Sequence, residues 1–428
     1  MPTALIEENT KIAIIGLGYV GLPLAIEFAK KFEVFGFDLN YERIRNLKCG
    51  YDETHEVDTD DLAQANNLSF TNALEDLKQC NIYIVAVPTP VDNANKPDMQ
   101  FLIAASELVK KVLSVGDIVI YESTVYPGAT EEVCVPILMK SDLEYNKDFW
   151  VGYSPERINP GDKSRGLKDI VKIVSGSSEY ACEIVNQLYL SIITAGTFPA
   201  SSIQVAEAAK VIENIQRDVN IALINEFDML FSKLNLPTHE ILDAANSKWN
   251  FLDFKPGLVG GHCIGVDPYY LTYRAEKAGF DPQLILAGRK INNSIPNWLA
   301  SNLIKVMLKN GIKILNSRIL IMGVTFKENC PDIRNSKVFN LMSELIEYGV
   351  FIDFYDPLLE SCEVIVPEGV TRVTNVSRNY EAVFIAVGHE KFLEFKEQDF
   401  SMMCSTKDLI FDYKGIFPSD YGLSRVWS

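Results

Sequence analysis

Short apolar runs alternate with helical segments along residues 1–200 and again after residue 311. A continuous apolar run of about four to eight residues is typical of a strand buried in a parallel sheet. The pattern therefore predicts an α/β fold with two Rossmann-like, doubly wound domains. The predicted strands are residues 11–15, 33–38, 82–87, 117–121, 149–153, 318–324, 351–355, 383–387 and 409–413, and the predicted helices of the first domain are residues 22–31 and 102–113.

Residues 202–234 carry a long helical pattern between the two domains. Its apolar residues include Ala208, Ile212, Ile215, Val219 and Ala222, and others occupy the remaining faces. A helix that is apolar nearly all round is buried on most sides, so we expect this long central helix to bridge domains or to form a subunit interface. With further helices up to residue 309, it predicts a helical middle domain. The predicted division is 1–200, 201–310 and 311–428.

A glycine turn follows the first predicted strand. Its sequence is Gly16-Leu17-Gly18-Tyr19-Val20-Gly21, and a helix and a second strand ending in Asp38 come next. This order of strand, G-x-G-x-x-G, helix, strand and acid is the dinucleotide-binding fingerprint. The glycines allow a tight turn and a close approach of pyrophosphate to the helix N-terminus. Asp38 favours NAD over NADP, since a carboxylate repels the 2′-phosphate.

Composition narrows the possible partners and the compartment. A net charge of −17 argues against binding to nucleic acid or to an anionic membrane. The eight cysteines include no C-x-x-C pair, and the four histidines are far apart, so we expect neither a disulfide framework nor a metal site. Residues 1–10 are polar and no apolar run has the length of a membrane span. We therefore expect a cytoplasmic chain.

The stretch from Pro256 to Leu271 concentrates candidate chemistry. It holds four glycines, at positions 257, 260, 261 and 265, around Cys263, with Asp267 four residues later. Glycines let another backbone come close, a thiolate is a nucleophile, and a nearby carboxylate can position water or take a proton. The alternative is a buried structural cysteine in a tight loop.

Several polar residues follow predicted strands or interrupt the long helix. Thr89, Thr124 and Glu156 lie after strands, where ligands bind in open α/β sheets. Ordinary turn chemistry would also account for each of them alone. Lys210 and Asn214 share a face of the central helix. Lys210 could stabilise an oxyanion beside the thiol, or the pair could form a polar edge facing solvent.

The first loop of the second predicted Rossmann-like domain runs from Thr325 to Arg334. It places Lys327 and Arg334 after a strand, an arrangement that suits a diphosphate. Surface salt bridges are the alternative.

Together these motifs resemble the UDP-glucose/GDP-mannose (nucleotide-sugar) 6-dehydrogenase family over essentially the whole chain. The stretches that carry the resemblance are Gly16–Gly21, Val87-Pro88-Thr89-Pro90, Glu122–Gly128, Ser154-Pro155-Glu156-Arg157, Ala209-Lys210 with Asn214, Gly260-Gly261-His262-Cys263 and Thr325–Arg334. Within the family, the cysteine stretch is similar to the branch that oxidises UDP-N-acetylhexosamines, UDP-N-acetylglucosamine above all, for bacterial capsule and O-antigen synthesis. His262 and Val266 stand where the UDP-glucose branch has Ser and Lys.

The resemblance implies two successive oxidations of the sugar C6 alcohol to a uronate, with two NAD. It assigns Cys263 as nucleophile, Lys210 as oxyanion stabiliser with Asn214 beside it, Asp267 as base or water-orienting group, and Glu156 and Thr124 as assisting residues. The residues that it assigns to NAD are Gly16, Gly18, Tyr19, Val20, Gly21, Asp38, Arg43 (near the adenosine ribose), Pro88, Thr89, Thr124 and Arg334 (near the domain junction). Those that it assigns to the UDP-sugar are Glu156, Arg157, Lys210, Asn214, Gly260 and Lys327. It implies no metal, and a homodimer is expected through the central helix.

Two other functions share parts of this pattern. A two-electron dehydrogenase of a hydroxy acid or sugar phosphate would need the first domain and the long helix but not Cys263. An NAD-sensing regulator would need only Gly16 to Asp38. UDP-N-acetylgalactosamine, UDP-N-acetylmannosamine and UDP-glucose stay open as substrates.

Overall fold

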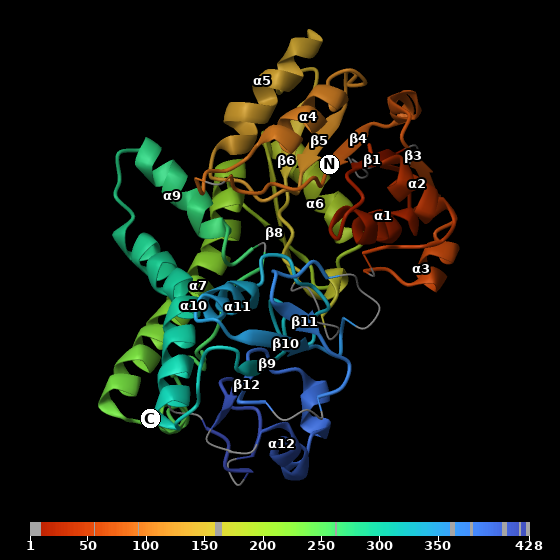
Figure 1. Cartoon of the computed structure of the whole chain (residues 1–428). Coiled ribbons are helices and arrows are strands. Elements are labelled where there is room, and N and C mark those ends of the chain that lie inside the picture. The colour runs from red at the N-terminus through yellow and green to blue at the C-terminus, as the bar shows by residue number, and fades with distance from the viewer. Residues whose placement is uncertain are drawn as a thin grey trace. The chain divides into compact units, whose positions relative to one another are not determined.

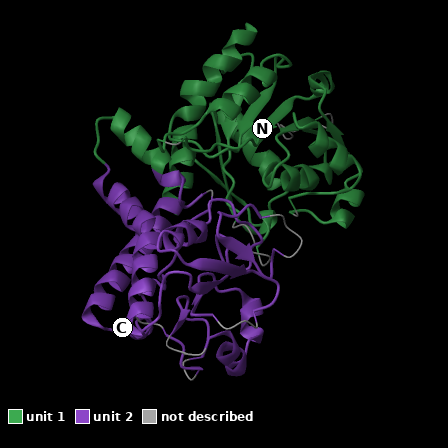
Figure 2. Cartoon of the chain, viewed as in Figure 1, with its two compact units in different colours: residues 1–213, 269–281 green, residues 214–268, 282–428 purple. Residues whose placement is uncertain are grey.

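The computed structural model describes residues 10–54, 56–92, 94–158, 165–261, 263–359, 364–376, 380–404, 409–418 and 421–424. The chain divides into two compact units (Figure 2). Unit 1 contains residues 1–213 and 269–281, and unit 2 contains residues 214–268 and 282–428. The predicted division into three domains stays a prediction.

Unit 1 is built on an eight-stranded sheet with the order β3-β2-β1-β4-β5-β6-β7-β8 (Figure 1). The first six strands in this order are mutually parallel, β7 is antiparallel to β6, and β8 is parallel to β7. The parallel part has the dinucleotide-binding order, with its switch point between β1 and β4. The strands are β1 (Lys11–Ile15), β2 (Glu33–Phe37), β3 (Leu68–Thr71), β4 (Ile82–Val85), β5 (Ile118–Tyr121), β6 (Trp150–Tyr153), β7 (Lys172–Gly176) and β8 (Thr197–Pro199).

The helices of unit 1 connect these strands. Their inward faces bury residues such as Leu24 and Phe28 of the first helix against Ile12, Ile14 and Ile84 of the sheet. The helices are α1 (Gly21–Ala29), α2 (Tyr41–Lys48), α3 (Thr59–Gln64), α4 (Gln100–Val109), α5 (Val135–Leu138) and α6 (Glu179–Leu190), with shorter helical turns η1 (Leu74–Gln79), η2 (Thr130–Cys134), η3 (Met139–Ser141) and η4 (Leu167–Asp169).

Unit 2 is built on a five-stranded parallel sheet with the order β11-β10-β9-β12-β13. Its core packs Leu320, Phe354 and Phe384 of the strands against Leu341 and Leu299 of the helices. The strands are β9 (Arg318–Met322), β10 (Phe351–Tyr355), β11 (Val370–Arg372), β12 (Ala382–Ile385) and β13 (Ile410–Asp412), and the helices are α8 (Thr238–Asn246), α10 (Gln283–Lys309), α11 (Lys337–Ile346) and α12 (Glu397–Met403), with the turn η5 (Glu390–Glu394).

Two helices contribute residues to both units. These are α7 (Ile203–Leu234), the predicted long central helix, and α9 (Asp267–Lys277), which begins just after the cysteine stretch. Among the described residues, no helix is both long and apolar enough to cross a membrane. The two sheets, one mostly parallel and one fully parallel, together with the long helix confirm the predicted fold class.

Candidate functional site

The glycine turn after β1 has the close contacts that its sequence predicted. Gly16 has a φ of +92°, and a Cβ there would lie 2.8 Å from the Ala86 carbonyl oxygen. A Cβ on Gly21 would lie 1.9 Å from the Gly16 carbonyl oxygen. A Cβ on Gly18, by contrast, would meet no described atom within 4 Å. Gly16 and Gly21 are therefore required by the fold, whereas Gly18 leaves open space in front of the turn, as the approach of a pyrophosphate requires.

The Asp38 carboxylate closes the end of β2 against the same turn. Its Oδ2 accepts a hydrogen bond from the Leu17 N–H at 3.0 Å, and its Oδ1 accepts one from the Asn40 N–H at 2.8 Å. Half-buried at this end of the sheet, the carboxylate has a fixed orientation. The donor set of the turn and this single acid fit the dinucleotide fingerprint of NAD. Tyr19 and Val20 complete the turn and are partly exposed.

Arg43 is buried and anchors the turn from behind. Its Nε and Nη2 donate to the Leu17 carbonyl oxygen at 2.9 and 2.7 Å, and its Nη1 donates to Asp52 at 2.7 Å. Burial raises the pKa of Asp52, but hydrogen bonds from Thr54 and Arg43 outweigh it and leave that pKa below its ordinary value. The guanidinium thus braces the loop that would hold NAD.

The loops after β4 and β5 are tied together. The Thr89 hydroxyl donates to the Thr124 carbonyl oxygen at 2.7 Å, and the Ser123 hydroxyl donates to the Val87 carbonyl oxygen at 2.7 Å. The buried Tyr270 of α9 donates to the Thr89 carbonyl oxygen at 2.6 Å. The structure therefore brings Thr89 and Thr124 together, with the exposed Pro88 on the same loop.

Glu156, after β6, belongs to a buried cluster of charges. Its Oε1 accepts from the N–H groups of Arg157 and Ile158, both at 2.5 Å. Its Oε2 makes no hydrogen bond to any described residue and lies 3.6 Å from the Lys172 ammonium. Lys172 in turn pairs with Glu122 at 2.6 Å, and the Tyr189 hydroxyl also donates to Glu122. One buried ammonium thus serves two carboxylates.

Lys172 was missed at the sequence level, because a lysine at the start of a short strand carries no recognisable signal. Its side chain is only 3% exposed, and its Nζ lies 5.4 Å from the centre of the Tyr189 ring. Burial raises the pKa of Glu122, partly offset by the Lys172 charge and reinforced by Glu156. Arg157 lies outside this cluster: it pairs with Glu213 at 2.6 Å and donates to the Val171 carbonyl oxygen.

Lys210 and Asn214 are both buried on α7, one helical turn apart. The Asn214 Nδ2 donates to the Asp267 Oδ2 at 2.5 Å, and Asp267 is itself buried. The polar edge facing solvent, which was the alternative for this pair, is therefore wrong. The pairing of Asn214 with Asp267 joins two of the predicted site residues.

Cys263 lies one turn ahead of α9. Its carbonyl oxygen accepts from the N–H of Val266 at 3.0 Å and from that of Asp267 at 2.8 Å. The residue is partly exposed, and it precedes a helix N-terminus, where the helix dipole favours a thiolate. His262, predicted to mark the substrate branch, lies outside the described residues.

The glycines before Cys263 pack against the loop that follows β9. A Cβ on Gly260 would lie 2.4 Å from the Asn335 carbonyl oxygen, and one on Gly261 would lie 2.8 Å from the Phe326 ring. The predicted close approach of a backbone is thus confirmed, and the approaching segment is that of Asn335. The loop predicted from the sequence ended at Arg334, so the prediction did not include Asn335.

A buried polar network holds the start of the cysteine stretch. The Asn225 amide donates to the Gly257 carbonyl oxygen at 3.1 Å and accepts from the Gly257 N–H at 2.9 Å. Asn225 also donates to Asn292, which donates to Asp218, the ion-pair partner of Arg289. The interruption of the apolar pattern of α7 at Asn225 was a visible signal, but its partner could not be read from sequence.

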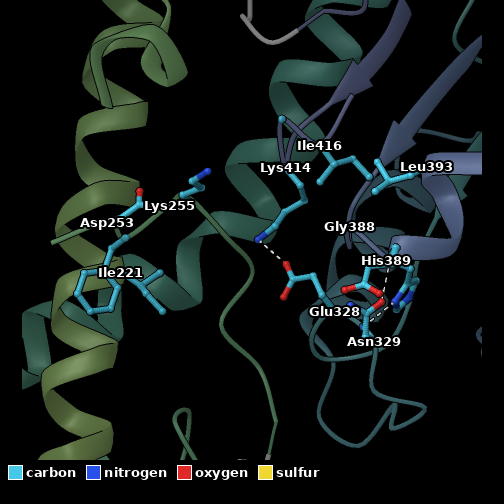
Figure 3. Close-up of a pocket in the computed structure, with 13 residues that line it drawn as sticks. Ile221, Asp253, Lys255, Glu328, Asn329, Gly388, His389, Leu393, Lys414 and Ile416 are labelled. Carbon is cyan, nitrogen blue, oxygen red and sulfur yellow. Dashed lines mark hydrogen bonds and ion pairs between the residues drawn. The ribbon is translucent and has the colours of Figure 1, made fainter. Parts of the chain in front are cut away.

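A cavity of about 570 Å³ opens in unit 2, where the loops after β9, β12 and β13 meet (Figure 3). It lies beside the switch point between β9 and β12, the usual place for a ligand in such a sheet. Figure 3 shows Lys414 extended towards Glu328 across the cavity, and the two form an ion pair of 2.9 Å. Its lining includes Ile221, Asp253, Phe254, Lys255, Asn329, Gly388, His389 and Ile416.

His389 fixes the floor of this cavity. Its Nδ1 accepts from the Asn329 N–H at 3.0 Å, and its Nε2 lies 3.1 Å from the Asp356 carboxylate. This arrangement is that of a neutral imidazole with the proton on Nε2. Of the residues predicted to bind diphosphate, Lys327 lies in the loop after β9, and its carbonyl oxygen accepts a hydrogen bond from the Thr325 hydroxyl. Arg334 is largely exposed and forms a bidentate ion pair with Asp332. This is the surface salt bridge that was the alternative to diphosphate binding.

Comparison with known proteins assigns most of the chain to one protein family. Three domain models of the UDP-glucose/GDP-mannose dehydrogenase family match it: the NAD binding domain at residues 10–193, the central domain at 204–294 and the UDP binding domain at 320–419. A UDP-N-acetyl-D-glucosamine 6-dehydrogenase of Salmonella typhi is 52% identical over 98% of this chain and 99% of its own length. Protein CapL of Staphylococcus aureus is 51% identical, over 96% of this chain and 97% of its own length.

The fold has a counterpart among solved structures. A UDP-D-ManNAc dehydrogenase from Pyrococcus horikoshii superposes with a TM-score of 0.84 at 31% identity, covering 94% of each chain. The three domain models follow one another in chain order and cover most of both sheets and the cysteine stretch between them. The chain belongs to the UDP-glucose/GDP-mannose dehydrogenase family, and it is an NAD-dependent oxidoreductase.

Proposed function

We propose that the protein oxidises the C6 hydroxyl of a UDP-N-acetylhexosamine, most specifically UDP-N-acetylglucosamine, to the uronic acid. The observation that carries this proposal is the cysteine turn: Cys263 stands at a helix N-terminus, one turn before a buried Asp267 that is bonded to Asn214. A two-electron dehydrogenase has no need of a nucleophile there. The substrate class rests on the similarity to relatives named for UDP-N-acetylglucosamine.

The acid product requires an oxygen atom to be added at the aldehyde carbon. In our proposal the Cys263 sulfur adds to that carbon and gives a thiohemiacetal, whose C–H is then oxidised to a thioester. Water attacks the thioester carbon, the C–S bond breaks, and the uronate, a proton and the thiol result. Bound NAD supplies the hydride acceptor for each oxidation.

The other site residues take the roles that their chemistry and the family pattern suggest. Lys210 stabilises the oxyanion with its ammonium group, and Asn214 holds Asp267 in place through the bond described above. Asp267 orients water or takes its proton. Glu156 and Thr124 assist positioning and hydrolysis, and Gly260 allows the close packing of the turn beside the substrate.

NAD would be held by the glycine turn, by Asp38 on the adenosine ribose, and by the joined Thr89 and Thr124 loops. The open space at Gly18 supports the pyrophosphate placement. Arg43 supports this site through its bonds to Leu17. Arg334 is proposed as a further NAD contact.

The uridine diphosphate is proposed to bind in the 570 Å³ cavity of unit 2. Its position beside a switch point supports this proposal. Lys255 and Lys414 on its lining, with Lys327 next to the lining residue Glu328, could neutralise the diphosphate charge. Binding would then separate Lys414 from Glu328 or use the pair as a bridge. Arg157 is proposed as an additional substrate contact.

We further propose a homodimer formed through α7. Val205, Ile212, Leu223 and Leu230 are each about half exposed, and their spacings of 7, 11 and 7 residues place them within about 20° of one helix face. Such an apolar stripe is typical of a covered surface. Capsule or O-antigen synthesis in the cytoplasm is the proposed setting, supported by the likeness to CapL.

A substrate screen tests the proposed function. Purified protein is mixed with NAD and each of UDP-N-acetylglucosamine, UDP-N-acetylgalactosamine, UDP-N-acetylmannosamine and UDP-glucose, and NADH is followed by absorbance. We expect UDP-N-acetylglucosamine to give the highest kcat/KM. Efficient oxidation of UDP-glucose alone would overturn the assignment of the substrate class.

A further inference from the structure

The turn that carries Cys263 and the loop that lines the nucleotide cavity are joined through one residue, Asn335. Its carbonyl oxygen accepts from the Gly261 N–H at 3.2 Å, and its side-chain Nδ2 donates to the Gly261 carbonyl oxygen at 2.8 Å. The N–H and the carbonyl oxygen of Gly261 are therefore both hydrogen-bonded to one residue of the loop after β9. Gly261 precedes Cys263 by two positions.

Asn335 is itself held in a constrained conformation. Its φ is +52°, in the left-handed region that asparagine tolerates better than most residues. The next residue, Ser336, caps α11 through the Val338 N–H and donates to the Thr325 carbonyl oxygen at 3.3 Å. Asn335 is therefore fixed at both ends, between the start of α11 and the loop from β9.

The same loop reaches the cavity a few residues earlier. Glu328 and Asn329 line it, and Asn329 is bonded to His389 on its floor. A ligand in the cavity would restrain these residues. Through Asn335 that restraint passes to Gly261 and to the cysteine turn, because no Cβ separates the two backbones at Gly260 and Gly261.

We propose that Asn335 is a positioning residue that couples occupation of the nucleotide cavity to the placement of the Cys263 thiol. This inference rests on the proposed function in one respect, that the cavity binds UDP. Without the Asn335 contacts, the cysteine turn can open away from the loop that follows β9. With these contacts, the turn and the loop open only together. UDP bound to the loop therefore suppresses opening of the turn.

The coupling predicts a measurable protection of the thiol. Cys263 is only partly exposed, and in this proposal iodoacetamide reaches its thiol through local opening of the turn. A ligand that binds only the closed form reduces the open population by a factor of 1 + [L]/Kd. At UDP equal to ten times its Kd, full coupling therefore slows alkylation by about 11-fold.

The experiment follows alkylation of Cys263 by peptide mass spectrometry, with and without UDP, in the full-length protein. Asn335→Asp keeps the size and the left-handed tolerance but replaces the Nδ2 donor with an oxygen that repels the Gly261 carbonyl. Asn335→Gly keeps the backbone conformation and removes the side chain. Calorimetry gives the UDP Kd of each protein, and the exposed Cys49 serves as an internal reference for the reagent.

Asn316→Asp and Asn316→Gly are the matched controls. Asn316 is also exposed and left-handed, with a φ of +67°, in the turn before β9, and its N–H donates to Gly349 rather than to the cysteine turn. They carry the same change in charge or in chain entropy without touching Gly261. We expect them to behave as the unaltered protein.

The expected result is protection near 11-fold in the unaltered protein and below about 2-fold in both Asn335 variants, at similar UDP affinity. The same variants should lower kcat at least tenfold while KM for the UDP-sugar changes less than threefold, a split that general loosening of the fold would not give. Equal protection in all proteins, or none in the unaltered protein despite measured UDP binding, would overturn the coupling. A lack of UDP binding to the unaltered protein would instead overturn the proposed nucleotide site, and the coupling with it.

Discussion

Replacing Lys172 with Met should destabilise the protein strongly, because this ammonium is the cation at 2.6 Å from Glu122 and 3.6 Å from Glu156. Both Lys172 and Glu122 side chains are at most 3% exposed, so solvent screens their interaction little. Removing one partner of a buried pair costs about 3–5 kcal/mol, since the remaining charge stays buried. For a unit of this size that corresponds to a fall in Tm of roughly 6–20 °C.

The effect should depend on pH with a definite sign. Burial already raises the pKa of Glu122 above its ordinary 4.5, and losing Lys172 removes a cause that lowers it. In the variant the folded state therefore binds a proton that the unfolded state releases, so stability falls as pH rises above 4.5 through the raised folded pKa. The Tm deficit should accordingly be smaller at pH 5 than at pH 8.

Thermal unfolding followed by circular dichroism measures both effects. The double variant Lys172→Met/Glu122→Gln is the control, because it removes the pair together and leaves no unpaired Glu122 charge. It should recover most of the lost Tm. A loss below about 1 kcal/mol in the single variant, or a double variant no more stable than the single one, would refute this account of the cluster.

Three other perturbations test separate parts of the structure. Gly21→Ala, whose Cβ would lie 1.9 Å from the Gly16 carbonyl oxygen, should lower Tm or prevent folding, whereas Gly18→Ala should leave Tm within a few degrees and weaken NAD binding at least tenfold by calorimetry; the opposite order would contradict the assigned glycine roles. Asp38→Asn should reduce the preference for NAD over NADP in kcat/KM by at least tenfold, and an unchanged ratio would exclude Asp38 as the selecting group. Leu223→Glu on the exposed stripe of α7 should convert a dimer to monomers in sedimentation experiments, while Glu226→Gln on the same helix should not; a monomeric unaltered protein would remove the dimer proposal.

The fold was largely predictable, because buried parallel strands are continuous apolar runs. The predicted strands 11–15 and 351–355 coincide with β1 and β10, and the others differ by up to two residues at an end. The strands that the pattern missed are mostly short ones at or near sheet edges. Leu68–Thr71 and Val370–Arg372 are edge strands in which polar and apolar residues alternate or the run is only three residues long.

The site residues were predictable where a local sequence motif identifies them. They were not predictable where their role depends on contacts with residues distant in sequence. The G-x-G-x-x-G motif predicts that Gly16 and Gly21 are closely packed and that Gly18 faces open space. The glycines of the cysteine stretch likewise predict the close approach of a backbone at Gly260. Nothing local indicates that Asn335 is the approaching residue, because its contact with Gly261 spans 74 positions of sequence. Nor does anything local indicate that Lys172 would meet Glu122, 50 positions away, and Glu156, on another strand loop. Buried polar partners of this kind are specified by the fold as a whole.

The central claim is a four-electron oxidation through Cys263, and the ratio of NADH formed to uronate released tests it most directly. NADH is measured by absorbance and uronate by chromatography, after complete conversion of limiting UDP-N-acetylglucosamine by the unaltered protein, with Cys263→Ala in parallel. We predict two NADH per uronate for the unaltered protein and no uronate at a comparable rate from the variant. One NADH per product, or uronate formed by Cys263→Ala at the unaltered rate, would contradict the covalent mechanism.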